Sequence, residues 1–241
     1  MRGILITAFF FTSGLSHAAT ILDTTRVIYN EHDKSKTFNV KNMGSSDSLM
    51  RVWIDTGDKE STSDSENLSF LVQPALFKIS SNASQVARII KLTKKLPKDR
   101  ESIFYINAIE MPAVEKSLNK QNKLVLITKS RIKLFYRPDS IKVISTDELK
   151  SSLNVRVHKY HDGYYLIIEN PTPVHASIFN GSLIVNNRKY EVPIEMIPPF
   201  ATKKWPINNY VQEGSKSGVV FNYTLVNDYG GYVRVEKSLG E

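Results

Sequence analysis

The sequence predicts an all-β protein made of two antiparallel β-sandwich domains in tandem. The chain has 241 residues and 41% hydrophobic content, enough for one large core or for two of about a hundred residues each. Runs with period two, rich in Val, Ile, Tyr and Phe, recur at intervals of about ten residues between polar turns. No amphipathic helical stretch competes with them. A single extended barrel is the alternative fold.

Residues 1–18, "MRGILITAFFFTSGLSHA", are predicted to be a cleaved secretory signal peptide. Arg2 precedes an apolar stretch, and the small residues Ser16 and Ala18 lie just before Ala19. A membrane anchor is the alternative, but the stretch is shorter than the roughly 20 residues that a spanning helix needs. We therefore expect the mature chain to begin near Ala19 outside the cytoplasm and, with no cysteine, to have no disulfide.

The first domain is predicted over residues 19–140. Its strands are expected in "KTFNVKNM", "LMRVWIDT", "FLVQPALFKIS", "VARIIKL", "SIFYINAIEM" and "NKLVLITKSRIKLFY". The last strand, about residues 122–137, ends before Pro138, because proline cannot continue a central strand. The polar residues 141–147 are the predicted linker.

The second domain is predicted over residues 148–241. Its strands are expected in "LNVRVHKY", "GYYLIIEN", "ASIFNGSLIV", "KYEVPIEM" and "VVFNYTLVND". Asp162-Gly163 and Asn186-Asn187 fall between such runs and predict tight hairpin turns.

The last strand of the first domain is unusual because Leu124 to Ile127 are apolar on both of its faces. Antiparallel sandwiches normally leave one face of a strand in water. Either the second domain or another polypeptide is therefore expected to cover this strand, and a buried internal strand is the plain alternative. Four cations follow and need carboxylate partners if they are buried: Lys129, Arg131, Lys133 and Arg137.

Composition and motifs argue against catalysis. Besides His17 in the predicted signal peptide, the chain has His32, His158, His161 and His175, and none of them has a metal-ligand spacing. We find no nucleophile elbow or phosphate-binding glycine loop. We expect no metal, cofactor or small-molecule substrate. The formal charge of +8 could suit an acidic partner, but export argues against nucleic acid.

Five motifs in order, "TTRVIYNE", "LPKDRESIFYIN", "SRIKLFYRP", "ENPTP" and "NDYGG", closely resemble periplasmic pilus chaperones of the PapD-like family. The resemblance covers the whole predicted mature chain. It implies two immunoglobulin-like sandwiches in a boomerang arrangement with an inter-domain cleft. Residues 113–122 form a short connection without a cysteine pair, which resembles the short-loop branch of the family.

The resemblance also implies a binding mechanism. Pilus subunits of this kind lack their last strand, and the chaperone fills the resulting groove with the last strand of its first domain. By position, the donor side chains are Leu124, Leu126 and Thr128. The resemblance likewise implies that Arg26 and Lys133 hold the C-terminal carboxylate of the subunit in the cleft.

The resemblance assigns Glu101, Arg137 and Asp228 to an ionic cluster between the domains. Such a cluster is expected to fix the angle between the sandwiches more than it stabilises them, because desolvation offsets much of the attraction.

Strict alternation places Lys133 on the face opposite Leu124 and Leu126. A binding surface shared by the three therefore requires a twist or bulge near Lys129–Arg131. If Leu126 points to the subunit, Val125 and Ile127 are expected to point into the core of the chain itself.

The predicted function is that of a chaperone that caps pilus subunits in the periplasm and hands them to an outer-membrane usher. A structural fibre subunit or adhesin of two sandwiches is the alternative, and a basic periplasmic enzyme is a third. Weak self-association of the free chain through its exposed edge is left open.

Overall fold

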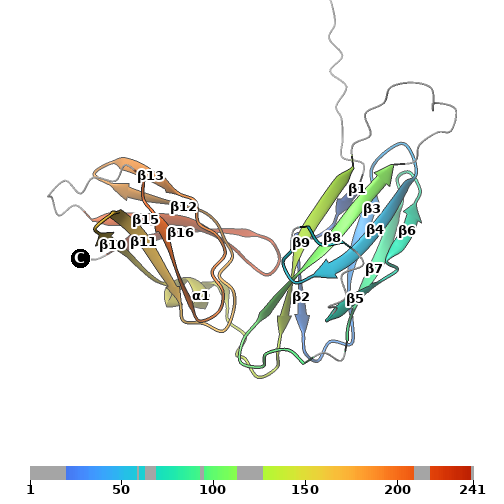
Figure 1. Ribbon diagram of the computed structural model, residues 1–241, viewed down its shortest axis with the longest axis horizontal. Helices are drawn as coiled ribbons and strands as arrows, with labels where there is room; N and C mark the ends of the chain where they lie inside the picture. Colours follow the sequence, from blue (N-terminus) through green and yellow to red (C-terminus); the bar gives the residue numbers. More distant parts are fainter. Residues whose placement is uncertain are drawn as a thin grey trace, which may run out of the picture.

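The computed structural model describes residues 20–58, 60–62, 69–92, 95–112, 127–208 and 218–239. Almost all regular structure in these residues is β-strand, arranged in two sandwiches that each have their own core. The sandwiches meet at an angle, so the molecule has the outline of a boomerang (Figure 1). The prediction of two sandwiches in tandem is confirmed, and two separate cores contradict the single barrel.

The first sandwich consists of a sheet in the order β1-β3-β7-β5 and a sheet in the order β2-β9-β8-β4-β6. Its strands are β1 (Thr20–Leu22), β2 (Arg26–Asn30), β3 (Lys36–Asn42), β4 (Ser48–Asp55), β5 (Phe70–Gln73), β6 (Leu76–Ile79), β7 (Ser84–Lys91), β8 (Ser102–Pro112) and β9 (Thr128–Arg137).

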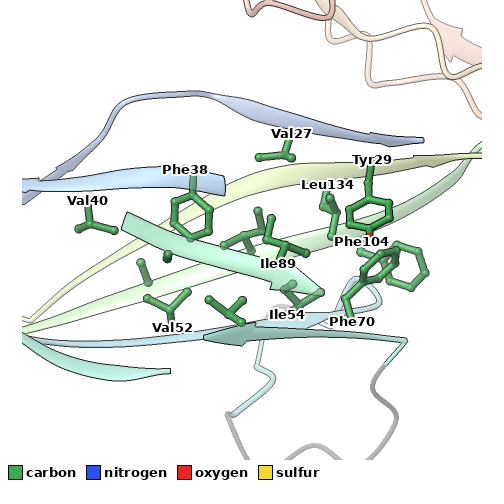
Figure 2. Packing of buried hydrophobic residues seen from close by; sticks show 14 of the residues in the cluster. Val27, Tyr29, Phe38, Val40, Val52, Ile54, Phe70, Ile89, Phe104 and Leu134 are labelled. Atoms are coloured by element: carbon green, nitrogen blue, oxygen red, sulfur yellow. The ribbon is translucent and has the colours of Figure 1, made fainter. Parts of the chain in front are cut away.

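Alternation along each strand fills the core of this sandwich. On β3, for example, Phe38 and Val40 are buried while their neighbours along the strand are exposed. Phe70 lies at the centre of an aromatic group, with ring centroids 5.2 Å from Tyr29 and 4.9 Å from Phe104 (Figure 2). The two sheets are therefore held together by a continuous apolar layer to which β9 contributes Leu134.

The chain changes sheets within its first few described residues. β1 pairs antiparallel with β3 in one sheet, whereas β2 pairs parallel with β9 in the other. The parallel pair begins at Arg26 opposite Lys133 and ends at Asn30 opposite Arg137. This change of sheet leaves the first half of β9 without β2 beside it.

The second sandwich consists of a sheet in the order β10-β11-β14 and a sheet in the order β13-β12-β15-β16. Its strands are β10 (Asn154–Tyr160), β11 (Gly163–Asn170), β12 (Ile178–Val185), β13 (Arg188–Val192), β14 (Ala201–Pro206), β15 (Val219–Val226) and β16 (Tyr232–Leu239). Both predicted hairpins form: Tyr160 pairs with Gly163, and Val185 pairs with Arg188. Asn186 and Asn187 both have positive φ (49° and 60°), as a type I′ turn requires.

One short helix, α1 (Thr146–Ser152), was not predicted and joins the two sandwiches. Ser145 is its N-cap, and the Ser145 side chain accepts a hydrogen bond from the backbone N–H of Glu148. At seven residues, the helix is too short to give a periodic hydrophobic signal. None of the helices in the described residues is long and apolar enough to cross a membrane.

Candidate functional site

The first half of β9 is an open sheet edge. β8 pairs with β9 from Thr128 to Tyr136 on one side, but β2 covers the other side only from Lys133 onward. Among the strand pairings of the described residues, none occupies that second side between Thr128 and Ile132. The backbone N–H and C=O groups along this edge are therefore available to another strand.

The two faces of β9 differ in chemistry. Ile132, Leu134 and Tyr136 pack into or against the core of the first sandwich, so the even-numbered side chains face inward. The register with β8 runs without a shift from Thr128 to Tyr136. Thr128 therefore lies on the core-facing side of the strand and Lys133 on the outer side.

This regular register corrects two expectations. No register shift interrupts the described part of β9, so the bulge considered near Lys129–Arg131 is absent from it. Ile127 was expected in the core but is 63% exposed, because it has the same parity as the outward-facing Lys129. Ile127 was placed wrongly because the donor side chains were assumed to lie on the face turned away from the core, and the bulge was expected because they were assumed to share that face with Lys133.

Three residues were predicted as donor side chains. Thr128 is exposed at the start of β9, opposite Glu110 of β8. Leu124 and Leu126 lie outside the described residues, so their prediction stays a prediction.

Arg26 and Lys133 stand side by side where β2 begins, at the end of the open edge. Arg26 is buried, its Nη1 donates to the carbonyl oxygen of Val226 at 3.1 Å, and its guanidinium lies over the ring of Phe135 at 5.9 Å. Within the described part of the chain, Arg26 Nε has no hydrogen-bond partner. Lys133 has no carboxylate within ion-pair distance among the same residues.

The charges of this pair are not balanced. Burial lowers the pKa of the Lys133 ammonium from its usual value, and the neighbouring Arg26 lowers it further. Burial also lowers the pKa of Arg26, which the charges of Asp228 and Glu101 only partly offset. Two partly desolvated cations on adjacent strands favour the binding of an anion between them.

The cations before and after Lys133 do have partners. Arg131 donates from Nη2 to Asp55 Oδ1 at 2.7 Å and lies 4.3 Å from the ring centroid of Tyr105. The Lys129 ammonium lies 5.2 Å from the ring centroid of Trp53. These contacts tie the outer face of β9 to β4 and β8 and hold the open edge in place.

Arg137 links the two domains. Its Nε donates to Glu101 Oε1 at 2.7 Å, and its two terminal nitrogens donate to the carboxylate of Asp228 at 2.6 and 2.8 Å. Burial alone would lower the pKa of Arg137, but the hydrogen bonds and charges of Asp228 and Glu101 raise it overall. The structure thus brings together the three residues that were predicted to form an ionic cluster.

His175 is a fourth member of this cluster that the sequence did not reveal. Glu101 Oε2 accepts hydrogen bonds at 2.8 Å from the backbone N–H of His175 and 2.7 Å from its Nδ1. The side chains of Glu101 and His175 are 1% and 5% exposed, so both oxygens of a buried carboxylate are satisfied. A single histidine two residues after a Pro-Thr-Pro loop gives no pattern by which this contact could be found.

The β15–β16 hairpin extends toward β9 and β2 (Figure 1), and residues of both domains line a cleft there. It encloses a cavity of about 300 Å³ lined by residues of both sandwiches, among them Arg26, Phe135, Val143, Leu225 and Asp228. Of the two cations at the end of the open edge, Arg26 therefore faces a hollow bounded by the second domain.

Comparisons with known proteins cover both domains. Residues 19–142 match the family described as pili and flagellar-assembly chaperone, PapD N-terminal domain. Residues 148–237 match the family described as pili assembly chaperone PapD, C-terminal domain.

The chain is 32% identical over 232 residues to the probable fimbrial chaperone YadV of Escherichia coli K12, a match that covers 95% of this chain and 92% of the relative. A solved structure of a YadV chaperone is similar with a TM-score of 0.76 at 29% identity, covering 92% of this chain and 100% of the other. The SafB chaperone, solved in complex with the SafA pilin of Salmonella enterica, is similar with a TM-score of 0.72 at 26% identity, covering 91% and 96%.

Proposed function

The chain belongs to the PapD-like family of pilus-assembly chaperones, and from this premise we propose that it binds pilus subunits in the periplasm by donor-strand complementation. The complex of the related SafB chaperone with a pilin supports a pilus subunit as the partner. Delivery of the bound subunit to an outer-membrane usher and removal of residues 1–18 as a signal peptide belong to the same proposal. The comparisons give no support to the alternative of a fibre subunit or adhesin.

The open edge of β9 is the observation that carries this proposal. A subunit strand added beside Thr128–Ile132 continues the line of β2 and reaches the Arg26–Lys133 pair at its end. If the strand runs parallel to β9, it finishes there with its C-terminal carboxylate. The terminus then supplies the anion that these two cations lack.

Leu124, Leu126 and Thr128 are the proposed donor side chains. Thr128 is on the side of β9 that faces the core farther along the strand, but Thr128 itself is exposed. Side chains on this face near the start of β9 can therefore enter the incomplete core of a subunit, while those farther along the same face pack into the chain's own sandwich. Lys133 acts from the opposite face on the end of the added strand, so the two roles need no bulge between them.

The carboxylate fixes the register of the added strand. Each charge-assisted hydrogen bond to Arg26 or Lys133 contributes roughly 1.5–3 kcal/mol. The Arg137 cluster supports this site indirectly, because it fixes the second domain and with it the carbonyl of Val226 that holds Arg26.

Synthetic peptides with alternating apolar residues test the proposal, one with a free C-terminal carboxylate and one with a C-terminal amide. We expect calorimetry on the mature chain to show at least about thirtyfold tighter binding of the free acid, and a matched surface variant, Lys150→Ala, to retain this preference. Equal binding of acid and amide would exclude Arg26 and Lys133 as the carboxylate site.

A further inference from the structure

The outer face of the sheet β10-β11-β14 in the second domain has an apolar residue at its centre. Ile167 of β11 lies between Leu166 and Ile168, which belong to the core of the second sandwich, so Ile167 points away from that core. It is nevertheless only 4% exposed. Its neighbours across the sheet are Arg156 of β10 and Lys204 of β14, and long cationic side chains cover apolar surface with their stems.

Aromatic rings extend this face toward the β10–β11 turn. Tyr165 of β11 pairs across the sheet with His158 of β10. The ring centroid of Tyr160 lies 4.7 Å from that of His158 and 5.3 Å from that of Tyr165. The Lys204 ammonium lies 5.0 Å from the ring centroid of Tyr160 and 5.3 Å from that of Tyr165. We call this surface the tyrosine–cation face, and it consists of Arg156, His158, Tyr160, Tyr165, Ile167 and Lys204.

The two permanent charges of the tyrosine–cation face are not neutralised by the chain. Among the described residues, no carboxylate lies within ion-pair distance of Arg156 or Lys204. Asp162 in the turn instead accepts a hydrogen bond from the Tyr165 hydroxyl at 2.9 Å. Glu169 stands at the opposite end of β11. The centre of the face is therefore positively charged and complementary to an anionic partner.

We propose that the tyrosine–cation face binds an anionic membrane surface through the phosphate groups of its lipids. Arginine and lysine attract anionic headgroups, and tyrosine rings, with an apolar body and a polar tip, favour the boundary between headgroups and acyl chains. The six side chains are spread over three strands, roughly 10 Å across the sheet. A planar surface can meet all of them at once, whereas a single extended acidic segment would follow only one strand.

The position of the face leaves the open edge of β9 free. β10 and β11 belong to the second arm of the boomerang, and β9 belongs to the first (Figure 1). A chain held at a membrane by its second domain would therefore present the open edge to subunits that have just crossed that membrane. Membrane binding itself does not depend on the proposed function, because it uses none of the residues of the subunit site.

Sedimentation with lipid vesicles tests the proposal. We expect the mature chain to sediment with vesicles that contain about 30% phosphatidylglycerol in about 0.05 M NaCl, and to be released in about 0.5 M NaCl, because salt screens surface charges. Pure phosphatidylcholine vesicles should not bind it. The double variant Arg156→Gln, Lys204→Gln should lower the affinity for the anionic vesicles at least about tenfold, since each cation contributes about fivefold.

Two further variants separate the face from net charge. The matched control Lys142→Gln, Lys150→Gln removes the same charge from two exposed lysines that pair with carboxylates, and it should keep the affinity. Tyr160→Ser keeps every charge and should weaken binding about threefold, because the ring no longer enters the lipid boundary. Glutamine retains part of the stem over Ile167, so unchanged melting temperatures are expected for both double variants.

Equal loss of binding in the two double variants would show that net charge alone draws the chain to the vesicles, and it would overturn the proposal. Absence of binding by the unchanged chain would also overturn it. If that chain binds poly-glutamate instead, and Arg156→Gln, Lys204→Gln does not, the face serves an acidic protein rather than a membrane. The free-acid and amidated peptides measure the proposed function separately, so either result can fail without the other.

Discussion

Replacing Lys133 with Met should stabilise the free chain and weaken subunit binding at the same time. Lys133 is half-buried beside Arg26, and no carboxylate among the described residues reaches it. Methionine keeps an unbranched apolar side chain and removes only the ammonium group.

The size of the effect follows from the pairing of the two strands. Side chains opposite each other on neighbouring strands have Cβ atoms roughly 5 Å apart, and two unit charges about 6 Å apart repel by about 3 kcal/mol at an effective dielectric constant of about 20. Water around the half-buried ammonium screens most of this repulsion. We therefore expect Lys133→Met to raise the free energy of unfolding by about 1 kcal/mol at pH 7.

The pH dependence gives a second check. The pKa of Lys133 is lower in the folded than in the unfolded chain, so the unfolded chain binds more protons between these two values. The wild type should gain stability relative to Lys133→Met as the pH rises through the folded pKa toward the ordinary lysine value. At pH 7 Lys133 is protonated in both the folded and the unfolded chain, so the full difference in the free energy of unfolding between variant and wild type is present.

Urea denaturation and calorimetry measure the two halves of this prediction. Binding of a free-acid peptide should weaken by about 2–5 kcal/mol, because the terminal carboxylate loses one of its two cations. A variant that is less stable than the wild type by more than about 1 kcal/mol would show that the ammonium makes a favourable contact in the free chain. Undiminished peptide binding would remove Lys133 from the site.

Three further predictions concern the domain cluster and β9. Asp228→Asn should weaken one side of the Arg137 cluster and broaden the distribution of domain angles in small-angle scattering. The melting temperature of each sandwich should change little, because the Arg137–Glu101 ion pair remains. Scattering and peptide binding identical to those of the wild type would contradict this role. Leu134→Asp should lower the free energy of unfolding by several kcal/mol, because Leu134 is fully buried. Ile127→Asp should lower it by less than about 1 kcal/mol, because Ile127 is 63% exposed. An equal drop in melting temperature for both variants would mean that Ile127 is a core residue. Leu126→Asp should abolish peptide binding while leaving the melting temperature nearly unchanged, and normal binding would exclude Leu126 as a donor side chain.

Much of the fold could be predicted from the sequence, because the period-two runs fill two cores by simple alternation, as in β3. The tight hairpin at Asn186-Asn187 was predictable for a similar local reason: asparagine tolerates positive φ. Helix α1 was missed because a single helical turn or two has no hydrophobic period, although Ser145 and Glu148 carry the signature of a capping box.

The site was less predictable, because it depends on which strands are neighbours. Odd and even positions along a strand point to opposite faces, so the sequence correctly places Lys133 and Thr128 on different faces. It does not show which face meets the core, and Ile127 was therefore assigned to the wrong side. The open edge itself arises where the chain leaves one sheet at Leu22 and joins the other at Arg26. The contacts of His175 with Glu101 and of Arg131 with Asp55 join residues far apart in sequence, and no local pattern indicates them.

The open edge raises the question of how the free chain avoids pairing with itself. Charged side chains on an exposed strand oppose edge-to-edge association, and the outer face here carries Lys129, Arg131 and Lys133 within five residues. Two copies that pair through this edge would bring like charges together. The C-terminal carboxylate of a bound subunit is instead attracted by the same positive charges.

Hydrogen exchange along β9 tests the central claim most directly, namely that a subunit strand pairs with the open edge and ends at Arg26 and Lys133. Exchange is followed by mass spectrometry on the mature chain, alone and with the free-acid or the amidated peptide. We predict that the free-acid peptide slows exchange in the segment Thr128–Ile132 and that the amidated peptide does so much less at the same concentration. Tight binding of the free-acid peptide without protection of this segment would contradict strand addition at β9.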